Sequence, residues 1–235
     1  MSILGIEDLK DIKILRQIFA EFLGTFLYLS ISLLAGTSLG AGAVATALAN
    51  GLLVASVIQI IGQVSGGHIN PAVTIGVLTC GCMKIMKAIL YITAQILGSI
   101  LGSLVAYAIV DSSSRNALGA TIPYSELRAY QILILEFITT FILVAVVLSV
   151  VDRKGLRNIA PIAIGLSITG CQCSAVLYSG SLNPVRSLGP AVAVNIWTHH
   201  WVYWVGPLLG GFLAGLTHKY IFNTNASTVN IIENE

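Results

Sequence analysis

The sequence predicts an all-α membrane protein, and three observations lead to that prediction: an apolar composition, long apolar runs and a repeated Asn-Pro motif. Of the 235 residues, 56% are hydrophobic and only 9% are charged, whereas soluble domains carry about 25% charged residues. A chain of this composition would expose apolar surface and aggregate in water, so we expect a lipid bilayer to cover that surface. The net charge of +2 and the absence of a basic cluster argue against a nucleic-acid partner.

Six apolar runs are long enough to cross a bilayer as helices, for which roughly 20 residues are needed. They are expected at about 15–36, 42–62, 86–110, 130–151, 158–178 and 201–222. Two further stretches, near 65–80 and 180–195, are apolar but too short to span. Irregular backbone is tolerated at membrane depth only where protein buries it or where it borders water. Each short stretch is therefore predicted to enter part-way, break, and continue as a half-helix.

Both short stretches carry near-copies of one motif, HINPAVT in residues 68–74 and SLNPVRS in residues 181–187. A proline is tolerated in the first turn of a helix, because the N–H it lacks would be unpaired there anyway. Asparagine is favoured at the N-cap just before that turn. The residues expected in these two roles are Pro71 and Pro184 as first helical residues, with Asn70 and Asn183 as their caps.

The two halves of the chain also match outside these motifs. The run AEFLGTF around Glu21 is similar to LEFITTF around Glu136, and each glutamate lies in the first span of its half. Three spans plus one half-helix make an odd number of crossings, so two such units must have opposite topology. This predicts an inverted repeat whose half-helices enter from opposite faces and meet at a shared site.

Lysine and arginine residues predict the orientation. With six spans both termini lie on one side, which holds nine of these residues, whereas the other side holds three. The excess places both termini in the cytoplasm. The smaller group is Arg115, Arg128 and Arg186.

Aromatic residues gather where the last span begins, as in an interfacial belt. They are Trp197, Trp201, Tyr203 and Trp204. The adjacent His199 and His200 are expected to be exposed loop residues.

On these motifs and the two upstream glutamates, nearly the whole chain resembles the aquaporin (major intrinsic protein) family, in its water-channel branch. The resemblance implies six transmembrane helices and two re-entrant half-helices in an aquaporin-like right-handed bundle. It also implies a homotetramer of independent passive pores for water that exclude protons and ions, with no enzymatic activity and no cofactor. We expect a multi-pass protein of the plasma membrane. Its parts are a cytoplasmic segment 1–13, a single channel domain 14–222 (repeats about 14–110 and 130–222, linker 111–129) and a cytoplasmic tail 223–235.

The resemblance also assigns site residues. The pore motifs are Asn70, Pro71, Ala72, Asn183, Pro184 and Val185; the selectivity filter is Asn50, Gln172, Gly180 and Arg186. The pore-lining carbonyls belong to Gly66, Gly67, His68, Ser179, Gly180 and Ser181, and Glu21 and Glu136 support the bent loops. No metal site is expected, because the four cysteines form two C-x-C pairs without histidine or carboxylate neighbours.

The predicted filter departs from the family pattern. Asn50 stands where water-selective members usually have Phe, and Gln172 stands where they have His, with a register uncertain by one residue. Val185 replaces the usual Ala and is expected to pack against Pro71. Asn50 and Gly180 would widen the filter, and the amides would make it more polar, so small uncharged solutes such as glycerol or urea are expected beside water.

One residue argues against a dedicated glycerol channel. Ser187 follows the filter arginine, where dedicated glycerol channels usually have Asp. The main alternative function is a glycerol/urea facilitator. An ion-coupled transporter or a non-conducting junctional protein fits the residues less well.

Overall fold

A computed structural model describes residues 3–7, 11–37, 42–112, 115, 117–123, 126–152, 158–174 and 180–222, and all regular structure in them is helical. The first half of the chain forms α1 (Ile12–Thr37), α2 (Ala43–Ser65), α3 (Pro71–Thr79) and α4 (Ile85–Ile109). The second half forms α5 (Ala129–Asp152), α6 (Ala160–Ser174), α7 (Pro184–Val194) and α8 (Val202–Thr217), which ends in the short π-helix η5 (His218–Phe222). Ser179 and the tail 223–235 lie outside the described residues.

Four helices are long and apolar enough to cross a membrane by length and composition: Ile12–Ala35, Ala43–Ser65, Ile85–Ile109 and Ala129–Val151. They correspond to the first four predicted spans. α6 and α8 have 15 and 16 residues, and η5 adds five to the end of α8. α3 and α7 have 9 and 11 residues, so each of these two is too short to span.

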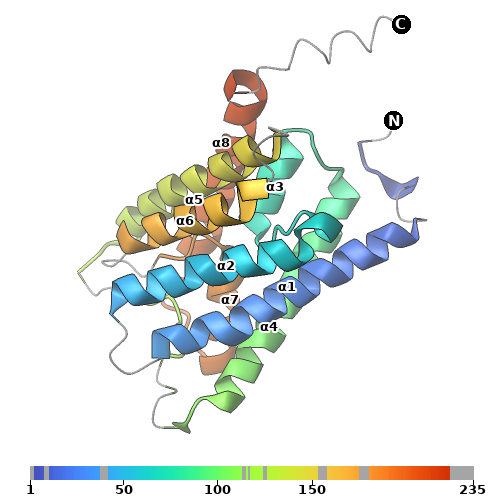
Figure 1. The fold of residues 1–235 in the computed structure, drawn as a ribbon. Coiled ribbons are helices and arrows are strands. Elements are labelled where there is room, and N and C mark those ends of the chain that lie inside the picture. The colour runs from blue at the N-terminus through green and yellow to red at the C-terminus, as the bar shows by residue number, and fades with distance from the viewer. Residues whose placement is uncertain are drawn as a thin grey trace, which may run out of the picture.

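The helices of the two halves pack in the same pattern, as Figure 1 shows. α1 packs on α4 and α2, and α5 packs on α8 and α6. α3 packs on α8, while α7 packs on α4, so each half lends its short helix to the other half. α2 of the first half packs on α6 of the second half. The repeat seen in the sequence therefore reappears as a repeated set of helix contacts.

Glycines let these helix pairs approach closely. A Cβ at Gly98 or Gly102 of α4 would meet the carbonyl oxygens of Phe22 and Phe26 on α1. In α8, a Cβ at Gly210 would meet the corresponding carbonyl oxygen of α5. Small residues at such spacing allow close contact between membrane helices. The tight packing brings α1 and α5, with their buried glutamates, against the centre of the molecule.

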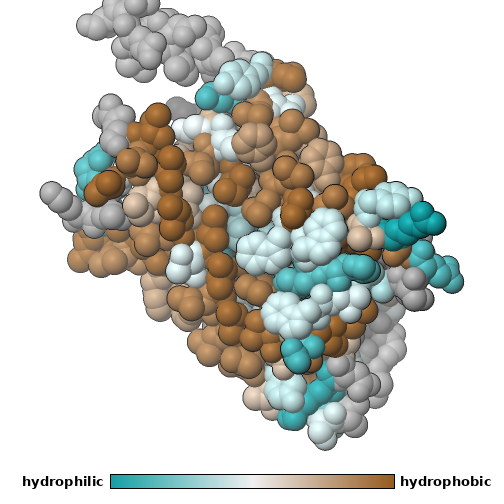
Figure 2. Space-filling model, turned by 180° about the vertical axis from the view of Figure 1, so that it is seen from behind, coloured by the Kyte–Doolittle hydropathy of each residue, from teal (hydrophilic) through white to brown (hydrophobic). Residues whose placement is uncertain are grey.

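The outer surface is largely apolar. Figure 2 shows hydrophobic residues over most of one face, with hydrophilic residues gathered toward one edge. Large side chains such as Ile60, Ile162 and Leu166 are more than half exposed. Since a soluble protein rarely exposes so continuous an apolar surface, lipid is its natural solvent.

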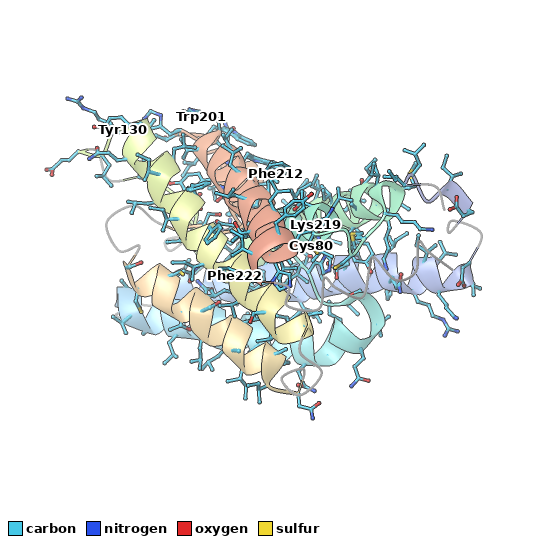
Figure 3. All side chains as sticks on the ribbon, turned by 90° about the horizontal axis from the view of Figure 1, so that it is seen from above. Cys80, Tyr130, Trp201, Phe212, Lys219 and Phe222 are labelled. Atoms are coloured by element: carbon cyan, nitrogen blue, oxygen red, sulfur yellow. The ribbon has the colours of Figure 1, made fainter. Side chains whose placement is uncertain are left out.

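The predicted aromatic belt needs one correction. Figure 3 places Tyr130 and Trp201 where α5 and α8 begin, and Lys219 and Phe222 at the far end of α8. Trp201 is half exposed, as a belt residue should be, but Tyr203 is fully buried because it faces the packed side of α8. Nor is His200 an idle loop residue, since its Nε2 accepts a hydrogen bond from Trp204 Nε1 over 3.2 Å. Desolvation lowers the pKa of His200, which favours the neutral ring that this bond requires.

We predict that Gly102→Ala destabilises the protein by about 1–3 kcal/mol, because the added methyl group overpacks the α1–α4 contact. Thermal unfolding in detergent, followed by tryptophan fluorescence, measures the change. Gly170→Ala on α6 is the matched control, since a Cβ there meets nothing within 4 Å. Helix propensity makes that control neutral or stabilising by up to about 1 kcal/mol. Equal midpoints of thermal unfolding for Gly102→Ala and Gly170→Ala would refute the role of Gly102 in the close contact between α1 and α4.

Candidate functional site

The two short helices begin in the same way. Asn70 caps α3, and its Oδ1 accepts a hydrogen bond from the Ala72 N–H over 2.8 Å. Asn183 caps α7, and its Oδ1 accepts from the Val185 N–H over 3.1 Å. A proline occupies the first helical position in both. The predicted caps are therefore confirmed.

The same two asparagines join the halves of the molecule. Asn70 Nδ2 donates to the carbonyl oxygen of Leu182 over 2.9 Å, and Asn183 Nδ2 donates to that of Ile69, also over 2.9 Å. Each amide nitrogen carries two N–H groups. One is used in this reciprocal bond, and the other has no partner among the described residues, so it remains for a further acceptor. The N-termini of α3 and α7 thus meet tip to tip, with an amide donor at each.

The residue before each asparagine has a backbone conformation that side chains rarely adopt. Ile69 has φ 43° and Leu182 has φ 58°. For a β-branched residue such as Ile69, a positive φ is a genuine outlier. The conformation points the N–H and the C=O of these residues to different partners. Each carbonyl accepts from the opposite asparagine, and each N–H donates to a buried glutamate.

Glu21 holds the first loop, and four donors converge on its carboxylate. Oε1 accepts from Ser65 Oγ over 2.6 Å and from the His68 N–H over 2.9 Å. Oε2 accepts from the Ile69 N–H over 2.7 Å and from Gln95 Nε2 over 2.9 Å. Glu21 is fully buried. Its role as a loop support, expected from the sequence, matches this geometry.

Glu136 stands in the same relation to the second loop. Its Oε1 accepts from the Ser181 N–H over 2.6 Å, and its Oε2 accepts from the Leu182 N–H over 2.9 Å. A chain of hydroxyl groups also holds this loop. Thr121 Oγ1 donates to Ser187 Oγ over 2.8 Å, Ser187 bonds Ser181 over 2.7 Å, and Ser181 Oγ donates to the Asn183 carbonyl over 2.6 Å. Through Thr121, the linker between the halves is tied to the site.

A cavity of about 840 Å³ opens beside the meeting point of the two short helices. Apolar side chains of α2, α5 and α6 form much of its wall, including Ile58, Val147 and Ile168. Seven predicted site residues line it: Gly66, Gly67, His68, Asn70, Gln172, Ser181 and Asn183. Both apolar side chains and polar groups therefore line the cavity.

The four predicted filter residues do not all border the cavity. Gln172 lines the cavity, but Asn50, Gly180 and Arg186 are not among its lining residues. Arg186 lies in the first turn of α7, 8% exposed, and its Nη1 donates to the Gly119 carbonyl over 2.6 Å. Asn50 Nδ2 donates to Gln172 Oε1 over 3.0 Å. Gly180 is half-buried next to the loop that Glu136 holds.

Among the remaining motif residues, Pro71, Ala72, Pro184 and Val185 are all buried. The carbonyl oxygen of Val185 accepts a hydrogen bond from Ser99 of α4 over 2.5 Å. The predicted contact of Val185 with Pro71 stays a prediction.

Sequence reasoning missed several supporting residues. Gln95 donates to both Glu21 and Thr74, and Tyr91 OH donates to the Ser65 carbonyl over 2.8 Å. Gln95 is a polar residue in the middle of an apolar span, which was the one available indication. Thr121 lies in a linker with no motif, so nothing in the sequence pointed to it.

Comparisons with known proteins agree with this arrangement. Residues 8–218 match the Major intrinsic protein family. Aquaporin-4 of Rattus norvegicus is 37% identical over 219 residues, which cover 88% of this chain and 67% of that protein. Aquaporin TIP4-2 of Zea mays is 37% identical over 235 residues, covering 92% of this chain and 88% of that one. The crystal structure of an aquaglyceroporin from Plasmodium falciparum has a TM-score of 0.79 at 24% identity, covering 92% of this chain and 99% of that one.

The fold and the paired asparagine caps define a helical membrane channel of the aquaporin type. This chain belongs to the major intrinsic protein family. Members of the family are passive channels rather than enzymes, as the sequence analysis expected.

We predict that Glu21→Gln lowers the free energy of unfolding by about 2–5 kcal/mol. Both carboxylate oxygens of Glu21 accept hydrogen bonds, and an amide NH₂ group cannot. Whichever way the new amide turns, its NH₂ group faces at least one backbone N–H, that of His68 or that of Ile69, and leaves it unpaired. Chemical or thermal unfolding in detergent measures the loss.

Glu7→Gln is the control for that substitution. Glu7 is exposed and pairs with Lys84 over 3.3 Å, so its change should stay within about 0.5 kcal/mol. If Glu21→Gln were as mild as Glu7→Gln, Glu21 would not be the support of the first loop.

Proposed function

We propose that the protein is a passive transmembrane channel for water that also admits small uncharged solutes and excludes protons and ions. The observation that carries this proposal is the reciprocal bond between each asparagine cap and the opposite loop, at the edge of a large cavity. In this account α6 and α8 complete six spans, and α3 and α7 are re-entrant half-helices. The fold of the aquaglyceroporin supports that topology.

Water selectivity follows from what the two helix ends offer. Each half-helix N-terminus carries about half a positive charge. Two of them meeting at one place repel a cation or hydronium, as in aquaporin-type pores. The remaining N–H groups of Asn70 and Asn183 donate to a passing water oxygen and so orient it. A water held by two donors cannot pass a proton along a hydrogen-bonded chain.

The carboxylates inside the bundle argue for a channel over an ion-coupled transporter. Coupled transport needs titratable or coordinating groups that exchange their partners near the midplane. Glu21 and Glu136 instead hold backbone N–H groups of the two loops. Both carboxylates are therefore committed to supporting structure.

The remaining expectations extend the proposal to the cell. The positive-inside pattern favours cytoplasmic termini, and we propose the plasma membrane as the location. The N-terminal segment and the end of α8 lie toward the same side of the bundle in Figure 1, which supports a shared side. A homotetramer is proposed from the family resemblance.

In this proposal the outer filter is formed by Arg186, Gly180, Asn50 and Gln172. Small neutral solutes such as glycerol and urea pass through it with water.

Stopped-flow light scattering on reconstituted vesicles tests the function. Water should leave the vesicles far faster than through bare lipid, because in this proposal it crosses through the cavity beside the two asparagine caps. Ile168→Trp should return the flux toward that of bare lipid, since Ile168 lines the cavity and indole would fill it. Leu166→Trp, on the same helix but 56% exposed, is the matched control and should conduct normally. Wild-type flux equal to that of bare lipid would refute the channel.

A further inference from the structure

Sulfur-containing side chains gather in the turn that joins α3 to α4. The chain has four cysteines and three methionines. Two of each lie within one run of seven residues, as Cys80, Cys82, Met83 and Met86. Cys82 is exposed, and the other three are partly exposed. Neither the proposed pore nor the supports of its two loops use these side chains, so their grouping calls for another explanation.

The backbone of the turn brings the two thiols together. The Gly81 N–H donates to the Leu78 carbonyl over 3.0 Å. The Cys82 N–H donates to the Val77 carbonyl over 3.1 Å, which completes the hydrogen-bond pattern of a Schellman motif at the end of α3. Gly81 has φ 88°, a conformation that glycine adopts without a steric penalty. The chain reverses at this glycine, and the side chains of Cys80 and Cys82 are in hydrogen-bonding contact.

The second C-x-C pair of the chain is arranged differently. Cys171 and Cys173 have the same spacing but lie inside α6. Residues two apart in a helix do not face each other, and the Cys171 thiol donates to the Thr139 carbonyl over 3.7 Å. Of the two pairs, the one in the turn therefore has the geometry to hold a single ion between its sulfur atoms.

Two thiols with thioethers close by in the sequence favour a soft cation. Cysteine and methionine sulfur atoms are the ligands that Cu(I) prefers, whereas a structural zinc ion takes four ligands from thiolate, imidazole and carboxylate groups. Within the described ranges, no group of three or more histidine, cysteine or acidic residues could hold a metal ion. The expectation of no metal site rested on missing histidine and carboxylate neighbours, which Cu(I) does not need.

We propose that Cys80 and Cys82 bind one Cu(I) ion, with Met83 and Met86 as additional soft donors. Cu(I) forms one bond to each thiol sulfur, both thiol protons go to solvent, and no electron is transferred. The ion and its two thiolates then carry one net negative charge. Lys219 of η5 offsets that charge, because its ammonium group acts electrostatically on the Cys80 thiol. Figure 3 shows Cys80 and Lys219 at the same end of the molecule.

The bound ion ties down the end of a helix that matters to the site. Cys80 is the C-cap of α3, and Asn70 is the N-cap at the other end of its nine residues. The turn lies on the face that carries the N-terminal segment, since the Met86 N–H donates to the Leu4 carbonyl over 3.0 Å. This face is proposed to be cytoplasmic, where thiols are kept reduced.

The test titrates Cu(I) into reduced, purified full-length protein in detergent under argon, in competition with a chromogenic Cu(I) chelator. Wild-type protein should withdraw one Cu(I) per chain. Cys80→Ser combined with Cys82→Ser should weaken binding by at least about 100-fold, the upper end of what the loss of an outer-shell partner costs a metal site. Cys171→Ser combined with Cys173→Ser is the matched control, because it removes the other C-x-C pair, and it should bind as the wild type does.

The two methionines are tested in the same way. Met83→Leu combined with Met86→Leu keeps the side-chain volume and removes both thioethers. It should weaken Cu(I) binding by about tenfold, the lower end of the same range. Unchanged affinity would overturn the role of the thioethers.

A second measurement uses the wild-type protein alone. Ag(I), which has the same preference for sulfur but does not change oxidation state, should protect Cys80 and Cys82 from alkylation, as located by mass spectrometry. Zn(II) at the same concentration should not. Wild-type protein that takes no Cu(I) from the chelator would overturn the site, and so would alkylation that Ag(I) leaves unchanged. Equal protection by Zn(II), or equal loss of Cu(I) in the Cys171 and Cys173 control, would overturn it as well.

Discussion

Every peptide group in the two loops that meet at the centre of the molecule needs a hydrogen-bond partner, and that requirement organises the rest of the structure. Within a bilayer an unpaired peptide group costs several kcal/mol. The loops before α3 and α7 have no helical partners of their own. Glu21 and Glu136 accept from their N–H groups, while Asn183 and Asn70 donate to their carbonyls. Tight glycine contacts bring the helices that carry these glutamates close enough to do so.

The loops are strained, and the bonds outweigh the strain. A residue held in the left-handed region costs about 1–3 kcal/mol, and Ile69 and Leu182 are both held there. A hydrogen bond to a charged group contributes about 1.5–3 kcal/mol, and each glutamate makes at least two of them with its loop. The strained backbone in turn aims two carbonyls at the opposite asparagines. The geometry that fixes the loops is thus the geometry that leaves one N–H of each capping asparagine without a partner in the described part of the chain.

Local patterns in the sequence were enough for the elements and for part of the site. Asparagine followed by proline is an N-cap signature, so Asn70 and Asn183 were placed correctly, and apolar runs located the four long helices. Long-range pairing was harder. Nothing local predicts a left-handed isoleucine, because its intrinsic preference opposes it and only tertiary contacts impose it. The Asn50–Gln172 bond joins residues 122 positions apart, and the Thr121–Ser187–Ser181 chain involves a linker without a motif. Tyr203 was misplaced because an aromatic run shows where an interface lies but not which member turns inward.

The N-termini of α3 and α7 face each other, and each carries an asparagine whose amide bonds the opposite loop through one N–H. The central claim is that this arrangement lets water through and stops protons. Measuring osmotic water flux and proton flux in the same reconstituted vesicles, with a trapped pH-sensitive dye, tests it most directly. We predict water flux well above that of bare lipid while an imposed pH gradient decays no faster than in protein-free vesicles. A pH gradient that collapses in step with the rise in water flux would contradict it.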